Sequence, residues 1–434
     1  MKKTILIAAA LLAIAAPAAV TADEFRLTAV ADYFGGIEPR AGYEAIRSRV
    51  FLRPWFSNSL PGTNIKWQLS ANLWVQPIAG PEGGSGYAVA PGDILDEAWL
   101  YLPLGSFDLS AGQKPIAYGF ADVFGPLNVV NAANRVPLSL DEPFDNRLPS
   151  PLVQLQFYPD FDSALELVYV PFMRPDRERM ADVYLPGADD TVRWRDEAFI
   201  LDEPHSLFVQ YSRFGERVDF QLLYGWYTDQ TPDFVRPAVL SAAAPDDIET
   251  VYRKRHVFGG AYAFKLGSGT FSQDIAFKLT DDLDGTDPGA RNAEITVNTQ
   301  YLANLPFGIL SQFSVVYAHF INHGKHELQA GDEEAALDYF AEAVQGFHTQ
   351  PLQNIAFIVA HFERQFLRER LKAELNVGFF FSPEIYLAPR LSYHLSDHWS
   401  VAGGADINLG DPPDAALRRN PNDDNFYLRV VFRY

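Results

Sequence analysis

Residues 425–434 read NFYLRVVFRY, and apolar or aromatic side chains stand at every second position counted back from the last residue. Those positions are Phe426, Leu428, Val430, Phe432 and Tyr434. Arg429 and Arg433 stand on alternate positions between them. Because successive side chains of a β-strand point to opposite faces, the stretch predicts a strand with one wholly apolar face and one face that carries charge.

The same period of two recurs along the chain. In 64–76, NIKWQLSANLWVQ, an apolar set that begins with Ile65 and Trp67 alternates with a polar set that begins with Lys66 and Gln68. Such segments predict about eighteen strands (16–18), with a mean length near the ~10 residues that a tilted strand needs to cross a bilayer. The predicted strands are 25–33, 44–56, 64–76, 93–102, 106–113, 151–160, 163–172, 204–214, 217–227, 251–265, 269–280, 292–303, 308–320, 354–367, 370–381, 384–395, 397–409 and 425–434.

Short and long connections alternate between these strands. The tight ones include 103–105, 215–216 and 368–369, and the long ones are 77–92, 114–150, 173–203, 228–250, 321–353 and 410–424. An exception is 382–383, which is short where a long connection is expected. Tight periplasmic turns and long outer loops are typical of a transmembrane β-barrel. The sequence therefore predicts an all-β fold, a transmembrane antiparallel β-barrel with both termini at its periplasmic end.

The composition favours such a barrel over a soluble β-protein, whose strands also alternate. After residue 22 no run reaches the about 18 apolar residues of a transmembrane helix, yet 14% of all residues are aromatic. The chain has no cysteine, and its net charge of −20 argues against a nucleic-acid partner. In lipid every backbone N–H and C=O must be paired, and strands achieve this only in a closed sheet.

The first 22 residues have the organisation of an export signal. Two lysines precede an apolar run, and small residues end it at Ala22. This pattern predicts a signal peptide over 1–22, cleaved after Ala22, with a membrane anchor as the alternative. The remainder, 23–434, is predicted to form one barrel domain because no linker or low-complexity block interrupts the strands.

With the apolar faces outward, the polar faces line the lumen, and closure makes the last, first and second strands neighbours. These strands are predicted to carry a basic stripe on the inner wall, formed by Arg429, Arg433, Arg26, Arg47, Arg49 and Arg53. Arg253 and Arg255 are predicted to add to it. A guanidinium group stays charged and presents planar donors suited to carboxylate or phosphate. The alternative for Arg26 and Arg433 is a role as interfacial anchors at the periplasmic rim.

The connection 114–150 is long, apolar and acidic toward its end. A loop of this length without regular structure is usually functional or disordered, and this one is too apolar for disorder. We expect it to fold into the lumen, bury its apolar residues and constrict the channel, with a cap on the outer rim as the alternative. Its candidate pore-lining carboxylates, opposite the basic stripe, are Asp122, Asp141, Glu142 and Asp145.

The sequence has few other patterns that indicate a functional or structural element outside the strands. The segment GDEEAALDYFAEAVQGF at 331–347 predicts a short helix on the barrel rim, with a solvated acidic loop as the alternative. His319, His323 and His326 have loose spacing and favour a solvated loop over a metal site, and His205 is expected to anchor at the membrane interface. The motifs G-x-S-x-G, P-loop and H-E-x-x-H are missing, so no catalytic residue, metal or cofactor is expected.

The whole chain after the signal peptide resembles a Gram-negative outer-membrane porin. The last residues are similar to the C-terminal signal that the barrel-assembly machinery reads, with matches at Phe426, Leu428, Val430, Phe432 and Tyr434. An internal segment is similar to a motif of a poorly characterised group of outer-membrane barrels, with matches at Gly112, Gln113, Gly119, Asp122 and Asn131. Tyr118 stands where that motif has Trp, and Ala132 where it has Pro. The resemblance implies an outer-membrane location, surrounding lipid and a homo-oligomer as one possible state.

The expected function is passive diffusion of small hydrophilic solutes, with the arginines favouring anions locally and the acidic outer loops favouring cations at the mouth. One alternative is a transporter of hydrophobic compounds with a plugged lumen, although only Asp23 and Glu24 precede the first strand. The other is a structural or adhesion barrel that displays its surface loops.

Overall fold

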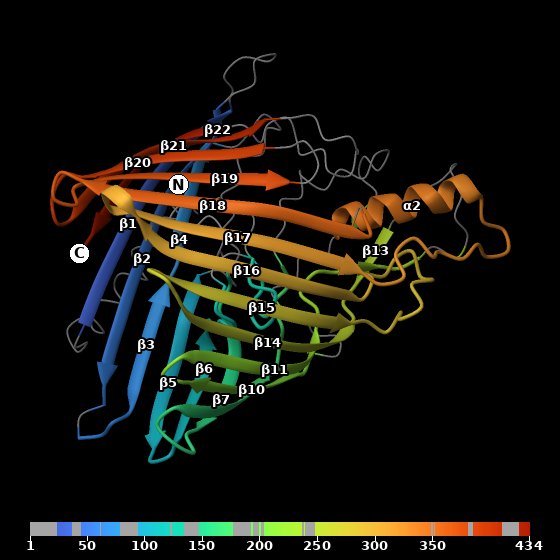
Figure 1. Cartoon of the computed structure of the whole chain (residues 1–434), viewed down its shortest axis with the longest axis horizontal. Coiled ribbons are helices and arrows are strands. Elements are labelled where there is room, and N and C mark those ends of the chain that lie inside the picture. Colours follow the sequence, from blue (N-terminus) through green and yellow to red (C-terminus); the bar gives the residue numbers. More distant parts are fainter. Residues whose placement is uncertain are drawn as a thin grey trace.

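The protein is described by a computed structural model (Figure 1). The predicted signal peptide at 1–22 and its cleavage site lie outside the described residues, and so does the acidic end of the connection 114–150. The described residues are 24–36, 45–60, 62–78, 94–121, 124–133, 147–176, 192–193, 199–200, 204–236, 238, 248–348, 350, 352–380, 385–409 and 425–434.

One antiparallel sheet forms the body of the molecule and closes on itself where β1 pairs with β22 (Figure 1). It has nineteen strand segments, but β3 and β4 are two parts of one crossing interrupted at Asn72, so the barrel has eighteen crossings. The strands are β1 Glu24–Gly36, β2 Ala45–Ser59, β3 Lys66–Ala71, β4 Leu73–Ile78, β5 Leu95–Leu104, β6 Phe107–Lys114, β7 Ser150–Phe157, β8 Ser163–Val170, β10 Ser206–Phe214, β11 Val218–Thr228, β14 Lys254–Leu266, β15 Gly269–Leu279, β16 Glu294–Leu305, β17 Ile309–Phe320, β18 Asn354–Phe366, β19 Leu371–Phe380, β20 Ile385–His394, β21 Trp399–Leu409 and β22 Asn425–Arg433.

The predicted all-β fold, the strand count and the order of short and long connections are confirmed. Tight turns such as 105–106, 215–217 and 267–268 join neighbouring strands at the end of the barrel where the C-terminus lies (Figure 1). The exceptional short connection near 382–383 does join two antiparallel neighbours, β19 and β20.

The two faces of the sheet differ as the alternation predicts. On β22, Leu428 is largely exposed on the outer face, whereas Tyr427, Arg429 and Val431 are buried on the inner face. Outward positions elsewhere are apolar and exposed, for example Leu100, Leu222 and Leu391, while inward positions hold buried polar groups such as Ser110, Gln154, Ser212 and Asn298. The ladder of the closed sheet pairs the backbone groups between these faces, as a lipid environment requires.

The long connections carry little regular structure of their own. The predicted helix is present as α2, Glu334–Phe347, which lies beyond the strand ends away from the C-terminus (Figure 1). Its predicted apolar face is buried, at Leu337, Phe340, Ala341 and Val344. A small second sheet pairs β12 Asp233–Phe234 with β13 Ile248–Val251, and β13 with β9 Val192–Arg193. In the described part of the chain, no helix is long and apolar enough to cross a membrane.

Candidate functional site

The connection after β6 packs against one side of the inner wall. Its buried apolar residues, Ile116, Tyr118, Leu127, Val129 and Val130, join one cluster with wall residues. The wall residues come from the inward faces of β7, β8, β10, β11, β14 and β15 and include Leu152, Val168, Phe208, Leu223, Val257 and Ala276. The sequence-predicted carboxylates Asp122, Asp141, Glu142 and Asp145 lie outside the described residues.

A buried carboxylate fixes the start of this segment. The Tyr118 hydroxyl donates a hydrogen bond of 2.6 Å to Oε1 of Glu166 on β8. The other oxygen of Glu166 accepts hydrogen bonds from Gln154 (2.5 Å) and Gln156 (2.7 Å) on β7. Because a buried carboxylate is costly without partners, this set of donors makes its inward position tolerable and ties the segment to two strands.

Asp274 on β15 holds the next residues. Its carboxylate accepts backbone N–H groups from Phe120 (2.9 Å) and Ala121 (3.2 Å). The backbone N–H of Gly119 donates to Gln221 on β11 (2.9 Å), and Gly119 has a φ of +92°. A Cβ at Gly119 would lie 2.0 Å from Oδ2 of Asp274, so the close approach requires glycine here.

The segment also contacts more distant strands. The carbonyl oxygen of Phe124 accepts a hydrogen bond from the Asn298 side chain on β16 (3.4 Å). The Phe124 ring meets the ring of Phe357 on β18 edge to face, with 4.9 Å between centroids. Contacts to β8, β11, β15, β16 and β18 therefore place residues 118–121 and Phe124 against a wide arc of the inner wall.

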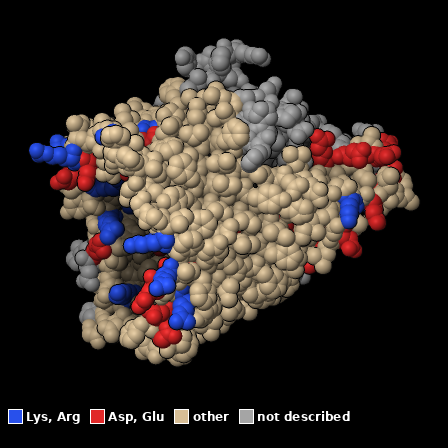
Figure 2. Space-filling model, in the orientation of Figure 1, with Lys and Arg blue, Asp and Glu red and all other residues tan. Residues whose placement is uncertain are grey.

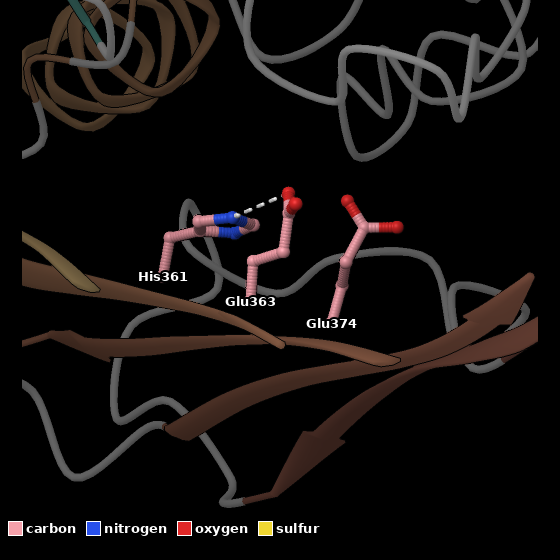
Figure 3. A group of neighbouring side chains, drawn as sticks. All are labelled: His361, Glu363 and Glu374. Carbon is pink, nitrogen blue, oxygen red and sulfur yellow. Dashed lines mark ion pairs between the residues drawn. The ribbon is translucent and has the colours of Figure 1, made fainter. Parts of the chain in front are cut away.

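Charged groups lie on other parts of the described inner wall. On β18 and β19, Glu363 and Glu374 are cross-strand partners, and Figure 3 shows both pointing to the same side with His361. Like charges in this position repel. Lys372 relieves the repulsion, since its Nζ lies 2.9 Å from Glu374 and 3.6 Å from Glu363, and Nε of Arg390 lies 3.5 Å from Glu374.

The three side chains of Figure 3 also meet the geometric requirement for a metal site. His361 Nε2 lies 4.0 Å from Oε2 of Glu363, and its Nδ1 lies 2.8 Å from Oδ1 of Asn376. Lys372 and Arg390 lie close enough to the two carboxylates to offset their charge, so the group is also an ion-pair cluster. The loop histidines have other partners: His319 contacts Asn354, and His326 contacts Gln345.

On the N-terminal side, Arg53 of β2 leads a second polar cluster. Its Nε donates to Asn72 (2.8 Å) and lies 3.4 Å from Oδ2 of Asp96. Asp96 also accepts from Ser70 and Asn72, at 3.1 and 2.9 Å. Next to it, Glu97 accepts from Gln68 and from the Trp99 indole, at 2.7 and 3.0 Å.

The strands of the predicted basic stripe are neighbours in the barrel, but acidic residues interrupt it. Arg433 and Arg53 both face Thr28 of β1 in register, which places them two strand spacings apart, roughly 10 Å. Arg429 and Arg49 both face Asp32, a residue that the sequence analysis missed. The side chains of Arg47, Arg49 and Asp32 lie outside the described part of the structure.

Two stripe residues, Arg429 and Arg26, lie in different surroundings. Arg429 points inward as predicted but is only 1% exposed. Arg26, at the start of β1, forms an ion pair with Glu24 and stacks over the Trp55 ring, 4.7 Å from its centroid. The Arg26 side chain is 64% exposed, and its role, in the stripe or as a rim anchor, stays a prediction.

Arg253 and Arg255 do not join the stripe, which corrects the prediction. Eight crossings separate β14 from β1 in each direction, β2 to β11 on one side and β15 to β22 on the other. The two arginines therefore lie on the opposite wall. Sequence spacing placed them on a strand but could not give the position of that strand around the barrel.

Arg255 instead belongs to a buried ionic cluster at the outer end of the barrel. Its Nε lies 2.5 Å from Asp229, and its Nη2 lies 3.1 Å from Asp233. Arg291 Nη1 lies 3.1 Å from Asp229, and its backbone N–H donates to Asp233 (2.9 Å). Burial would raise the pKa of Asp229, but the Arg291 and Arg255 guanidinium groups hold it below its usual range.

His348, which follows α2, packs onto the same cluster. Its Nε2 lies 2.9 Å from the carbonyl oxygen of Pro232 and 3.4 Å from Asp233. Burial lowers the pKa of His348 well below its usual value, and Arg291 adds to this effect. The cluster joins residues 229–234, Arg291 and the end of α2, and so it fastens three outer connections together.

In the lumen-facing ion pairs, the basic partner is the more exposed one. The Arg53 side chain is 46% exposed and Asp96 is 12% exposed. For Lys372 and Glu374 the fractions are 29% and 10%. Figure 2 shows a hollow at the end where the short turns lie, with both basic (Lys and Arg) and acidic (Asp and Glu) side chains gathered around it. In these two pairs the cation is therefore more accessible to solvent than its acidic partner.

Comparison with known proteins identifies solved structures that have a similar fold. No family model and no curated protein matches the sequence. Among solved structures, the chain is similar to a BenF-like porin from Pseudomonas fluorescens Pf-5, with a TM-score of 0.52, 10% identity, and 95% of this chain and 97% of that chain covered. It is also similar to OccAB3 from Acinetobacter baumannii (TM-score 0.51, 10% identity, coverage 94% and 98%) and to OpdK from Pseudomonas aeruginosa, solved with vanillate (0.50, 11%, 94% and 98%). At this identity the likeness shows the fold, and the fold is that of outer-membrane porins.

Proposed function

We propose that the protein is an outer-membrane channel, without catalytic activity, through which small hydrophilic solutes diffuse down their gradients. Three features support this function: the closed sheet, its apolar outer face and its polar inner face. A barrel of about 16–18 strands is wide enough to hold water rather than be filled by its own side chains. One of the similar solved structures is described as a BenF-like porin, which agrees with the proposal.

We propose that the connection 114–150 folds into the lumen and forms the constriction. Its described part covers the inner faces of β7 to β15, so the open path runs along the charged wall from β18 through β22 to β5. Asp274 and Glu166 hold the constriction in place. Solutes are then sorted by width against the loop and by charge against the wall.

The greater exposure of the basic partners carries the proposal of anion preference. A carboxylate that passes Arg53 or Lys372 meets a cation whose own acidic partner is further from the solvent. Arg26, Arg47, Arg49 and Arg429 are proposed to extend the positive potential along the same side. The acidic outer loops attract cations to the mouth of the channel. We propose that the charged groups at the constriction nevertheless determine whether anions or cations pass more readily.

Reversal potentials in a planar bilayer under a KCl gradient test this proposal. The wild-type channel is expected to prefer Cl⁻, and Arg53→Gln is expected to shift the preference toward K⁺. Asp96→Asn is the matched variant in the same ion pair and is expected to shift it toward Cl⁻. Cation selectivity of the wild type that Arg53→Gln leaves unchanged would rule out the positive pathway, and an absence of conductance would rule out the channel.

A carboxylate solute gives a second measurement. OpdK was solved with vanillate, an aromatic carboxylate, which makes vanillate a reasonable test solute for this chain. We expect vanillate to reduce the KCl current by occupying the pathway, and to do so less in Arg53→Gln. A hydrophobic-compound transporter would instead show no ion current, and so would a barrel that only displays loops.

The terminal segments complete the proposal. Residues 1–22 are proposed to direct export and to be removed after Ala22, and 425–434 are proposed to be read by the barrel-assembly machinery. Lipid surrounds the barrel, and a homo-oligomer is compatible with its broad apolar outer face.

A further inference from the structure

Residues 127–133, in the connection after β6, follow the part that is bound to the inner wall. Asn131 lies among them and is buried. Its Oδ1 accepts a hydrogen bond from the backbone N–H of Ile116 (2.6 Å), and its Nδ2 donates to the carbonyl oxygen of Leu148 (3.0 Å). One side chain therefore joins the start and the end of this connection, so a displacement of residues 127–133 also affects both ends.

Two side chains from neighbouring connections bind residues 127–133. Gln230, which follows β11, donates from Nε2 to the carbonyl oxygen of Val129 (2.7 Å). Asp176, which follows β8, accepts the backbone N–H of Ala133 at Oδ1 (2.7 Å). The Oδ2 of Asp176 accepts the hydroxyl of Thr231 (2.6 Å), and its backbone N–H donates to the carbonyl oxygen of Gln230 (2.9 Å). Asp176 therefore joins the connection after β6 to the connection after β11.

The residues of the connection after β11 that make these contacts lie inside the ionic cluster of Arg255. Asp229 precedes them and pairs with Arg255 and Arg291, while its other oxygen accepts the backbone N–H of Thr231 (3.1 Å). Asp233 follows them and pairs with Arg255. Both aspartates are buried, and a buried charge that loses its partner is strongly destabilised. Since only three residues separate the two aspartates, a displacement of the cluster also displaces the residues between them.

We propose that Asp176 and Gln230 are positioning residues that couple the ionic cluster at the outer end of the barrel to the constriction. This inference rests on the channel proposed above and adds that the state of the outer connections alters the width of the pathway. While the cluster is intact, the two side chains hold residues 127–133 near the outer ends of β8 and β11. When the cluster opens, both contacts are lost together, and the connection keeps its bonds to Glu166 and Asp274. An unbroken set of contacts with two arrangements is the physical basis of such coupling.

Hydrogen–deuterium exchange of the whole protein in detergent measures the coupling at a peptide that covers 127–133. Arg291→Gln weakens the cluster, because it removes a partner of Asp229. It is expected to accelerate exchange at 127–133 by roughly tenfold, the lower end of the effect of losing a hydrogen bond to a charged group. In a protein that carries both Asp176→Ala and Gln230→Ala, exchange is expected to be fast already. Arg291→Gln is then expected to add no further change.

Two further variants separate coupling from a general loss of structure. Asp176→Asn is the conservative variant, since its amide oxygen still accepts the N–H of Ala133, and its exchange at 127–133 should stay close to that of the wild type. Arg236→Gln is the matched control, because Arg236 pairs with Asp332 in the outer connections instead of with the ionic cluster. It is expected to leave exchange at 127–133 unchanged.

Three results would overturn the coupling. The first is faster exchange at 229–234 in Arg291→Gln with unchanged exchange at 127–133. The second is the same acceleration by Arg291→Gln with and without the side chains of Asp176 and Gln230, and the third is an equal acceleration by Arg236→Gln. If Arg291→Gln loses the gel mobility of an unheated, folded barrel, Arg291→Lys replaces it, since lysine keeps the charge.

Single-channel records separate this inference from the channel itself. A wild type without conductance contradicts only the channel, because hydrogen exchange reports the coupling without a current. In a conducting protein, Arg291→Gln is expected to show more frequent steps to higher conductance levels than the wild type. Current levels that are the same in Arg291→Gln and the wild type would overturn the link between the ionic cluster and the constriction.

Discussion

The hydroxyl of Tyr118 and the carboxylate of Glu166 are joined by a buried hydrogen bond of 2.6 Å, across 48 residues of sequence. The bond connects the segment after β6 to the inner wall at β8. A hydrogen bond to a charged acceptor contributes about 1.5–3 kcal/mol. It is therefore strong enough to decide how often the segment leaves the wall.

Tyr118→Phe removes this bond and keeps the ring. Glu166 retains its two glutamine donors, so the barrel should assemble normally. We expect more frequent conductance steps and a higher mean open current in single-channel records. The control is Tyr158→Phe, whose hydroxyl donates to Gln156 in an exposed position (3.1 Å). Records that are identical in all three proteins would show that the segment does not limit the current.

Asp274 provides a second and independent test of the same segment. Asp274→Ala removes the acceptor for two backbone N–H groups, and Gly119→Ala places a methyl group within contact of that carboxylate. Both variants should displace residues 119–121 and widen the distribution of conductance levels. Asp219→Asn, which perturbs only an acceptor for Gly215 in the turn at 215–217, is the control. Unchanged conductance in both test variants would remove Asp274 from the constriction.

The strand positions follow from local pattern, and the structure shows why. The period of two depends only on residues that are neighbours in the sequence. A strand can therefore be predicted without knowing which strands it pairs with. The largest boundary differences are three residues, as in 25–33 against Glu24–Gly36. The amphipathic helix α2 was predictable for the same local reason.

The wall chemistry was not predictable to the same degree, because register and closure decide it. Asp32 faces both Arg49 and Arg429 only after β1 pairs with β2 and β22. Asp274 meets Phe120 across 154 residues, and no local signal marks that contact. Arg255 was identified as an inward arginine but lies opposite the stripe, since sequence spacing does not give the angle around a barrel.

The His348 cluster predicts a loss of outer-loop stability in acid. Burial and the nearby Arg291 and Arg255 guanidinium groups keep the pKa of His348 well below its usual value, against the attraction of Asp229 and Asp233. The unfolded loop binds a proton near pH 6.5 and the folded loop does not. The folded cluster therefore loses up to about 1.4 kcal/mol per pH unit as the pH falls below about 6.5.

Hydrogen–deuterium exchange of peptides over 286–293 and 340–348 measures this loss, after correction for the intrinsic rate at each pH. Exchange should accelerate from pH 7.5 to pH 5 in the wild type. His348→Gln keeps a donor for the Pro232 carbonyl and should flatten the dependence. His398→Gln, in an exposed turn at the other end of the barrel, should leave it unchanged. A wild type whose exchange is independent of pH would show that His348 does not limit opening.

Variants of the C-terminal residue can distinguish recognition by the barrel-assembly machinery from closure of the sheet between β1 and β22. The backbone of Tyr434 makes two hydrogen bonds to Leu27, at 2.9 and 2.8 Å, and its ring lies near Phe25 and His398. Deletion of Tyr434 removes the bonds and the ring, whereas Tyr434→Ala removes only the ring. If the machinery reads the aromatic ring, both changes should lower the yield of folded protein in the outer membrane by a similar factor.

The same pair of variants distinguishes a purely structural role. If closure of the β1–β22 ladder is what matters, Tyr434→Ala should assemble normally and only the deletion should fail. Purified protein refolded into detergent without the machinery supplies the matched measurement. Tyr434→Ala that refolds as the wild type in detergent but fails in cells assigns the ring to recognition, and failure in both settings assigns it to the packing of Phe25 and Tyr434 at the closing strands.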